Sequence, residues 1–278
     1  MSDTVETLKA WPDGHYYSPI PDLGEVRKDA DRIFGRRETI PGVDLALTAQ
    51  QALLPALAEQ ALQAPFLQQG SGTRYQAEND FFGIGDALAW FGLLRLWRPR
   101  RVIEVGSGWS SAVLLDARDC TPGWSPELHF VEPYPERLHS LLRSSDEVHI
   151  LEAAAQSLDP SFFSQLESGD VLFIDSTHVS RIGSDVNYLL LEVLPRLAKG
   201  VRIHVHDIHF PFEYPSQWVF EGRAWTEAYL LRALLTDSTS LRITWWNSAL
   251  AQLVGAEVAA ALPPWQGNPG ASLYLERI

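Results

Sequence analysis

The stretch RVIEVGSGWSS, residues 101–111, indicates which fold this chain adopts. Arg101–Val105 is a short apolar run of the length expected for a buried strand. Gly106 and Gly108 follow it directly, and glycines at a strand-to-helix turn let the backbone come close to a bound ligand. The next helix would begin with free N–H groups at the same place. The stretch therefore predicts a strand, a ligand-binding turn and a helix.

Outward from this stretch, short apolar runs alternate with helical patterns. The clearest helical pattern covers residues 185–197, and others cover 48–63, 86–97 and 226–235. Strands alternating with helices form parallel βαβ units with helices on both faces of the sheet. The predicted fold class is therefore α/β, with a Rossmann-like, doubly wound, seven-stranded sheet. The runs predicted as strands are 101–105, 128–132, 148–151, 171–175, 201–207, 241–247 and 272–277.

The part of the chain before residue 71 has a different pattern. Prolines and glycines interrupt the first forty residues, which favours an irregular arm. The helical pattern at 48–63 follows this arm. We therefore expect residues 1–70 to form an arm and a helical extension, and residues 71–278 to form the main domain. The arm could cover the mouth of the site or serve as a contact in a homo-oligomer, and the sequence favours neither.

Composition excludes several classes of protein. The 22 Lys and Arg residues against 35 Asp and Glu give a formal charge of −13, which would repel nucleic acid. The single cysteine, Cys120, excludes a disulfide framework and a multi-cysteine metal site. The chain contains no apolar run of about 18 residues that could span a membrane, and its first residues lack the apolar core of a signal peptide. We expect a soluble, cytoplasmic protein whose partner is a small molecule.

Three acidic or polar positions narrow the choice of ligand. A dinucleotide fingerprint needs a third glycine at position 111, where this chain has Ser111. Glu104 stands at the strand end, and a carboxylate there suits a cationic ligand better than a pyrophosphate. Glu132 ends the next predicted strand, where a carboxylate can accept both ribose hydroxyl protons of a nucleoside. An NAD(P)-dependent oxidoreductase on a related fold is the alternative, and Ser111 and Glu104 weigh against it.

On these residues, the chain resembles the class I S-adenosylmethionine-dependent methyltransferases over about residues 71–278. Several segments are similar to a bacterial small-molecule methyltransferase family that includes antibiotic-tailoring O-methyltransferases. These segments are HYYSPIPD (15–22), NDFF (79–82), EPYP (132–135), FIDSTH (173–178) and HVHD (204–207). The resemblance implies S-adenosylmethionine as the cofactor, the strand order 3-2-1-4-5-7-6 and an antiparallel last strand at 272–277.

The resemblance also implies how the cofactor lies. Its methionine part would face Glu104 and the turn Gly106, Ser107 and Gly108. Glu132 would hold the ribose, and Tyr134 and Gln156 would flank the adenine. Tyr75 and Asn79, which precede the first strand, would close over the cofactor.

A second cluster follows the fourth and fifth predicted strands. Asp175 and His178 come after the fourth strand, and His206 and Asp207 end the fifth. Ligands of a doubly wound sheet bind at the carboxyl ends of its strands, so these residues should converge beside the reactive methyl group. Carboxylates and an imidazole can bind a divalent cation, which predicts a metal site of Asp175, His206 and Asp207. Catechol O-methyltransferases look similar here, but Ile208 stands where they have Asn.

The expected function is methyl transfer to an oxygen, or less readily a nitrogen, of a small molecule. His178 is the predicted general base because its unperturbed pKa lies near neutrality, and Asp175 would help to hold the acceptor. His206 is the rival base if no metal binds. His204 is expected to be a packed core histidine, and the aromatic loop after residue 209 is expected to form the acceptor wall. Use of the sulfonium for a reaction other than methylation remains an alternative.

Overall fold

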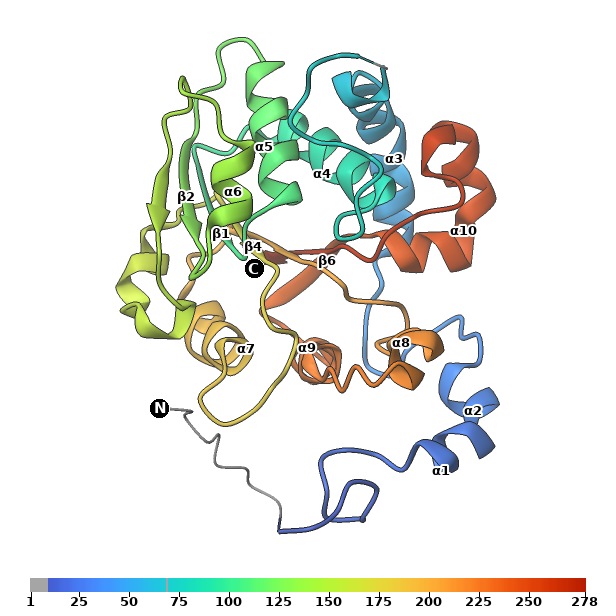
Figure 1. Cartoon of the computed structure of the whole chain (residues 1–278). Coiled ribbons are helices and arrows are strands. Elements are labelled where there is room, and N and C mark those ends of the chain that lie inside the picture. The colour runs from blue at the N-terminus through green and yellow to red at the C-terminus, as the bar shows by residue number, and fades with distance from the viewer. Residues whose placement is uncertain (1–9, 69) are drawn as a thin grey trace.

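The computed structural model describes residues 10–68 and 70–278, and a seven-stranded sheet runs through its centre (Figure 1). The strands are β1 (Arg101–Val105), β2 (Glu127–Val131), β3 (His149–Leu151), β4 (Val171–Ile174), β5 (Arg202–Val205), β6 (Leu241–Trp246) and β7 (Leu273–Arg277). Their order is β3-β2-β1-β4-β5-β7-β6, and β7 is antiparallel to both of its neighbours. This confirms the predicted α/β fold, strand order and reversed last strand.

Helices cover both faces of the sheet. They are α1 (Leu23–Lys28), α2 (Ala30–Phe34), α3 (Leu47–Ala61), α4 (Ile84–Trp97), α5 (Trp109–Asp119), α6 (Glu136–Leu141), α7 (Asp185–Asn187), α8 (Ser216–Phe220), α9 (Glu227–Leu235) and α10 (Asn247–Ala261). Figure 1 shows α4 and α5 on one side of the sheet and α7 and α9 on the other. Alternate residues of each strand supply the two cores: Val102 and Phe173 pack toward α4, and Ile103 and Leu172 pack on the opposite face.

Helix α4 is buried on nearly all sides. Its residues from Gly85 to Leu94 are all buried, because α3, α5 and the sheet surround it. An apolar helix of this kind belongs to a core. No helix among the described residues combines the length and the apolar character needed to cross a membrane.

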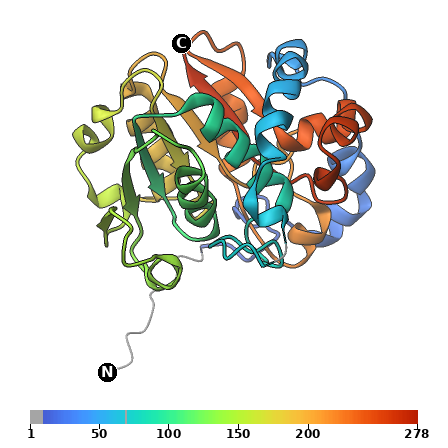
Figure 2. The same ribbon diagram turned by 90° about the horizontal axis from the view of Figure 1, so that it is seen from above.

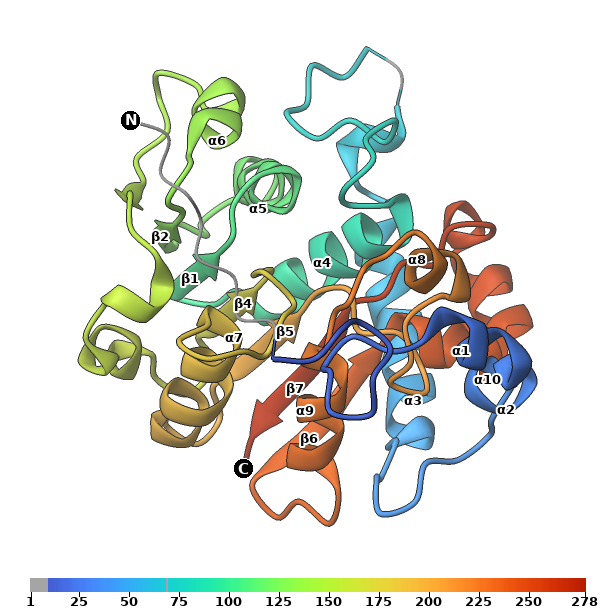
Figure 3. The ribbon, with the colours of Figure 1, turned by 60° about the horizontal axis from the view of Figure 1, so that its bottom comes forward.

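The segments before residue 71 pack onto this body in two places. Helix α3 lies beside α4 and α10 (Figure 2), and Leu54 and Leu57 belong to the same hydrophobic core as Trp90 of α4. Helices α1 and α2 lie against α8 (Figure 3), where Arg27 and Phe34 contact the ring of Phe220. The first nine residues of the predicted arm, and residue 69, lie outside the described residues.

Two helical segments differ from the sequence expectation. Residues 185–197 are not one regular helix: α7 passes into a π-helix, Tyr188–Val193, and then a 3-10 turn, Leu194–Arg196. Pro195 cannot donate a backbone hydrogen bond, which accounts for the break near the end. Helix α10 was not expected, because its Ala-rich sequence shows little periodicity. Its backbone leaves helical geometry at Val254, with φ −139°.

Four strands, β2, β4, β5 and β6, end one or two residues earlier than predicted. The run 201–207 forms a strand only as far as Val205, so His206 and Asp207 lie in the turn after β5. Asp207 has a φ of +57°, a left-handed conformation that cannot continue a strand. The turn therefore directs both side chains toward the carboxyl end of the sheet.

Candidate active site

A cavity of about 590 Å³ lies at the carboxyl ends of β1, β2, β4 and β5. The turn Gly106–Gly108 and Glu132 line one end of it, and Asp175, His178, His206 and Asp207 line the other. A second cavity of about 550 Å³ shares His206 and Asp207 with the first. The two predicted clusters thus face a common space, with room for two ligands.

The glycine turn brings β1 and β4 into close approach. Gly106 has a φ of +79°, and a Cβ placed on it would lie 1.7 Å from the carbonyl oxygen of Asp175. Both the conformation and the space therefore require glycine at this position. The backbone of the turn is left open to the cavity, as a cofactor cradle requires.

Glu132 lines the cavity with its carboxylate fixed at both oxygens. Oε2 accepts a hydrogen bond from the Ser107 N–H at 3.1 Å, and Oε1 accepts one from the Tyr134 N–H at 2.9 Å. The side chain is only partly buried. A preoriented carboxylate in this place fits the role predicted for it, acceptance of ribose hydroxyl protons.

Glu104 lies behind the glycine turn rather than in the cavity wall. It is fully buried, and Oε1 accepts hydrogen bonds from the Ser110 and Ser111 hydroxyls at 2.6 and 2.8 Å. Burial raises the pKa of this carboxyl to about 8. Ser111 Oγ also accepts from the Gly108 N–H at 2.9 Å, so the position where a dinucleotide fingerprint has glycine here holds the turn in place.

Tyr75 and Asn79 bond to the loop that follows them, and Asn79 also lines the second cavity. The Tyr75 hydroxyl and the Asn79 side-chain amide both donate to the Phe82 carbonyl, at 2.7 and 3.0 Å. Asn79 Oδ1 accepts from the Phe82 N–H at 2.7 Å. The side chains that this loop presents to the cavity are those of Asp80, Phe81 and Phe82.

Tyr134 and Gln156, predicted beside the adenine, are both exposed and neither lines the cavity. The Tyr134 side chain is 77% exposed, and only its backbone N–H takes part in the site, through Glu132. Their predicted contact with the cofactor stays a prediction.

His178 lies between two carboxylates. Its Nδ1 is 2.9 Å from Glu227 Oε2, and its Nε2 is 3.3 Å from Asp175 Oδ1. The backbone of His178 has a φ of +58°, and its carbonyl accepts hydrogen bonds from the N–H groups of Thr226 and Glu227 at the start of α9. The turn at His178 and the start of α9 therefore hold the imidazole and the Glu227 carboxylate next to each other.

The pKa of His178 is the main correction to the sequence expectation. Burial disfavours the imidazolium, but the hydrogen bonds and charges of Asp175 and Glu227 outweigh it and raise the pKa to about 10. For Asp175, burial opposes ionisation, but His206 and His178 outweigh it and hold its pKa well below the usual range. His178 is therefore an imidazolium at neutral pH in the free protein, not a neutral base.

His206 also lies between carboxylates. Its Nδ1 is 3.4 Å from Asp175 Oδ1, and its Nε2 is 3.5 Å from Asp86 Oδ2 and 3.8 Å from Asp207 Oδ1. Asp86 Oδ1 is held by the backbone N–H groups of Ala271 and Ser272, which leaves Oδ2 facing the ring. Burial opposes the charge, but Asp207 and Asp175 raise the pKa of His206 well above its usual value.

This arrangement fits ion pairs better than the predicted metal site. Asp175 Oδ1 is 3.3 Å from His178 Nε2 and 3.4 Å from His206 Nδ1. Asp207 is 3.9 Å from His178 Nε2 and 3.8 Å from His206 Nε2, so both carboxylates pair with both imidazoles. Within residues 10–68 and 70–278, the one group of three side chains with mutually close ligand atoms lies elsewhere, at the start of β2.

Comparison with known proteins agrees with this geometry. Residues 103–208, which run from β1 to the turn after β5, match the family model described as a methyltransferase domain. The sheet has the strand order of that superfamily, with the reversed β7 between β5 and β6. Residues 103–208 are a methyltransferase domain, and they lie in a sheet with the strand order of the class I S-adenosylmethionine-dependent methyltransferases. An NAD(P)-dependent oxidoreductase is thereby set aside.

Known proteins and solved structures are similar to this methyltransferase. An uncharacterized protein of Archaeoglobus fulgidus is 31% identical over 168 residues, which are 58% of this chain and 76% of that protein. The SAH-bound methyltransferase PaMTH1 of Podospora anserina is 12% identical, with a TM-score of 0.48 over 87% of this chain and 100% of that one. The O-methyltransferase TomG of Streptomyces achromogenes, in complex with SAM, is 14% identical, with a TM-score of 0.45 over 91% of this chain and 96% of that one.

Sequence reasoning missed two residues of the methyltransferase site, Asp86 and Glu227. Each is a single buried acid in an otherwise apolar helix, with side chains 4% and 0% exposed. Both stand in the first turn of their helices, where an acid is ordinarily explained by the helix dipole. Their apolar helical neighbours were the signal that could have separated them from ordinary capping residues.

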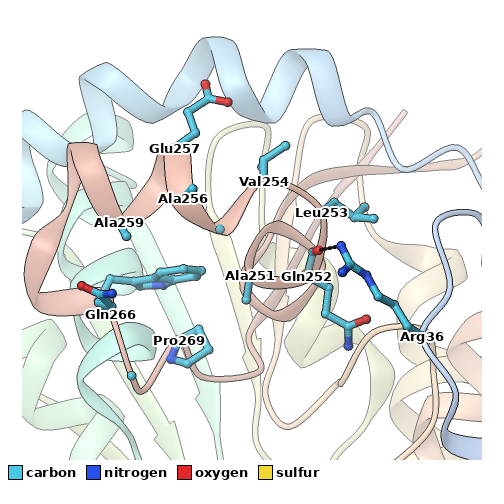
Figure 4. A pocket seen from close by; sticks show the side chains of 13 residues that line it. Arg36, Ala251, Gln252, Leu253, Val254, Ala256, Glu257, Ala259, Gln266 and Pro269 are labelled. Atoms are coloured by element: carbon cyan, nitrogen blue, oxygen red, sulfur yellow. Dashed lines mark hydrogen bonds between the residues drawn. The ribbon is translucent and has the colours of Figure 1, made fainter.

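Two other features of the methyltransferase lie apart from this chemistry. His204 is fully buried beside Phe173 and Tyr274, as expected for a core histidine, and burial lowers its pKa well below the usual value. A larger cavity of about 670 Å³ lies at the bend of α10 (Figure 4). There the Arg36 guanidinium donates to the Gln252 carbonyl, and no group of acids and histidines lines the space.

Proposed function

We propose that this methyltransferase transfers the methyl group of S-adenosylmethionine to a hydroxyl oxygen of a small, flat acceptor. The observation that carries the proposal is the position of His178. Its Nδ1 is held by buried Glu227, while Nε2 lies beside Asp175 at the cavity. A histidine oriented in this way is suited to remove a proton from an oxygen nucleophile.

The other end of the cavity fits the cofactor. Glu132 would accept the ribose hydroxyls, and the backbone of Gly106 and Ser107 would lie against the methionine part. When bound, S-adenosylmethionine supplies an electrophilic methyl group on a positively charged sulfur. The neighbouring cluster has four carboxylates, Asp86, Asp175, Asp207 and Glu227, against two imidazoles, His178 and His206. Its net charge, 2 − 4 = −2 with all six groups ionised, favours a cationic ligand.

A positive charge on the ligand would also change the pKa of His178. A cation in the adjoining cavity disfavours a second positive charge on His178 and lowers its pKa toward neutrality. Neutral His178 would take the acceptor's hydroxyl proton at Nε2 as the oxygen bonds to the methyl carbon. The methyl group would pass from sulfur to that oxygen, the electron pair of the carbon–sulfur bond would stay on sulfur, and His178 would then release the proton to water. Asp175 would accept a hydrogen bond from a second donor group of the acceptor and so keep the reacting oxygen in line.

The acceptor side of the cavity is aromatic. Trp225 packs on His178 with ring centroids 4.3 Å apart, and Arg223 lies over Trp218 at 4.4 Å. Phe81 lines the opposite wall. Flat rings bind well between such surfaces. We therefore favour a phenol, because its flat ring fits these surfaces and its hydroxyl, with a pKa of about 10, loses a proton far more readily than an aliphatic alcohol.

A transfer assay tests the proposal. The protein is incubated with methyl-labelled S-adenosylmethionine and matched panels of phenols, aliphatic alcohols and amines, and products are identified by mass spectrometry and NMR. We expect methyl ethers from the phenol panel and none in parallel reactions of His178→Gln. Methylation confined to amines, or consumption of the cofactor without any methylated product, would refute the proposal.

A further inference from the structure

A histidine pair lies at the far end of β2 from the cofactor cavity. His129 of β2 and His149 of β3 are partners in the parallel register of these strands, so their side chains lie on the same face. Their rings are stacked, with centroids 4.7 Å apart and an interplanar angle of 21°. Glu127 stands two residues before His129 and shares its face of the sheet. Three residues with metal-binding side chains therefore project from one patch of surface.

The ligand atoms of this patch are close together. His129 Nε2 is 2.7 Å from Glu127 Oε1, and one ligand atom from each of Glu127, His129 and His149 lies within 4.8 Å of the others. A tetrahedral zinc site with bonds of about 2.0–2.2 Å places its ligand atoms about 3.3 Å apart. The His149 side chain is exposed, so a small rotation closes the remaining gap.

Surrounding groups already orient two of these ligands. Arg101 donates to Glu127 Oε2 from Nε at 2.9 Å and from Nη2 at 2.6 Å, which leaves Oε1 facing His129. Phe162 packs edge-on against the His129 ring at 5.7 Å. Outer partners that fix a carboxylate and an imidazole in this way accompany metal ligands in proteins. In the active-site cluster, by contrast, Asp175 and Asp207 pair with the imidazoles of His178 and His206.

We propose that Glu127, His129 and His149 bind a divalent transition-metal ion such as Zn²⁺, with water as the fourth ligand. Two imidazoles and one carboxylate favour zinc over magnesium, which prefers oxygen ligands. The ion would join the edge strand β3, only three residues long, to β2. Because the loop after β3 leads to Ala155 and Gln156, the site would stabilise the edge of the sheet next to the cofactor-binding region.

Calorimetric titration of the full-length, chelator-treated protein with ZnCl₂ tests this site without any activity measurement. We expect one ion to bind per chain and Tm to rise by roughly 5 °C at a hundredfold excess over Kd, with no response to MgCl₂. His149→Gln should abolish both effects, and it replaces an exposed side chain, so it leaves the fold intact. His129→Gln should do the same.

Two matched variants complete the experiment. His139→Gln alters another exposed histidine, on α6, and His206→Gln alters the active-site cluster. Both should keep the zinc response of the unaltered protein. Zinc binding that survives His149→Gln, that is lost in His206→Gln, or that is undetectable in the unaltered protein would overturn the proposal.

Discussion

The two ends of the active-site cavity are assembled in different ways. At the cofactor end the contacts are local: Glu104 meets Ser110 six residues away, and Glu132 meets Ser107 across 25 residues. At the proton-transfer end, His178 meets Glu227 across 49 residues, and His206 meets Asp86 of the distant helix α4. The cofactor end can therefore be recognised from a motif, whereas the titration behaviour of the other end depends on tertiary packing.

His204 of β5 and His206, in the turn after it, show the same dependence on tertiary packing. His204 and His206 are two residues apart and both are almost fully buried. Aromatic neighbours surround His204, and burial lowers its pKa, while Asp207 and Asp175 raise the pKa of His206 despite burial. Burial alone therefore does not set the charge of a histidine; the nearest carboxylates do.

The two ends of the cavity should differ most in how a substitution changes kcat. We expect His178→Gln to lower kcat by roughly 10²–10⁴-fold, because proton removal from the acceptor is lost. The Kd of the cofactor should change little, because the cofactor's contacts lie at the other end. His209→Gln, in the loop beside the second cavity, is the matched control and should stay within a few-fold of normal. A near-normal kcat in His178→Gln would show that His178 is not the general base.

At the cofactor end, the effect should appear in affinity. Glu132→Ala should weaken cofactor binding by roughly 1.5–3 kcal/mol, because charge-assisted hydrogen bonds to the ribose are lost. Calorimetry with S-adenosylmethionine measures it, and exposed Glu136→Ala, at the start of α6, is the control. An unchanged Kd in Glu132→Ala would contradict the assignment of Glu132 to the ribose.

Stability should depend on pH through His178. Its folded-state pKa of about 10 lies above the ordinary histidine value of about 6.5, so its imidazolium stabilises the fold fully below pH 6.5. This contribution, on the order of 2–4 kcal/mol, is lost as the pH rises through the folded-state value. Urea unfolding should therefore show a larger loss of stability between about pH 6.5 and about pH 10 in the unaltered protein than in His178→Gln. Parallel losses in the two proteins would count against the ion pairs with Asp175 and Glu227.

Metal removal should have the smallest effect on turnover. Because Asp175 and Asp207 pair with His178 and His206, we expect EDTA to leave kcat within about twofold of its value in untreated enzyme. If EDTA abolished most of the activity and an added divalent cation restored it, a metal site formed after rotation of His206 would be favoured instead.

Local patterns were sufficient for the frame of the molecule and for one end of the site. The alternation of runs predicted the α/β sheet, and the resemblance to class I methyltransferases implied its observed strand order. Glu132 follows β2 and lines the cavity. Convergence of Asp175 and His206 also followed from the strand ends. The pKa of His178 did not, since it depends on Glu227, whose contact requires α9 to dock at the end of β4.

Other differences have equally specific physical causes. Tyr75 and Asn79 were expected at the cofactor, but both side chains bond to the Phe82 backbone, which no sequence pattern encodes. Glu104 was expected to face the cofactor, but two serine hydroxyls on α5 hold it beneath the turn.

The central claim is that His178, and not His206, removes the acceptor's proton, and the pH dependence of kcat in two isosteric variants tests it directly. Glu227→Gln removes a carboxylate from beside His178, and Asp86→Asn removes one from beside His206. We expect Glu227→Gln to move the acidic limb of the pH–kcat profile to lower pH by about one unit, because the imidazolium of His178 loses a stabilising charge. Asp86→Asn should leave that limb in place. A limb that moves in Asp86→Asn and stays fixed in Glu227→Gln would contradict the claim and assign the proton to His206.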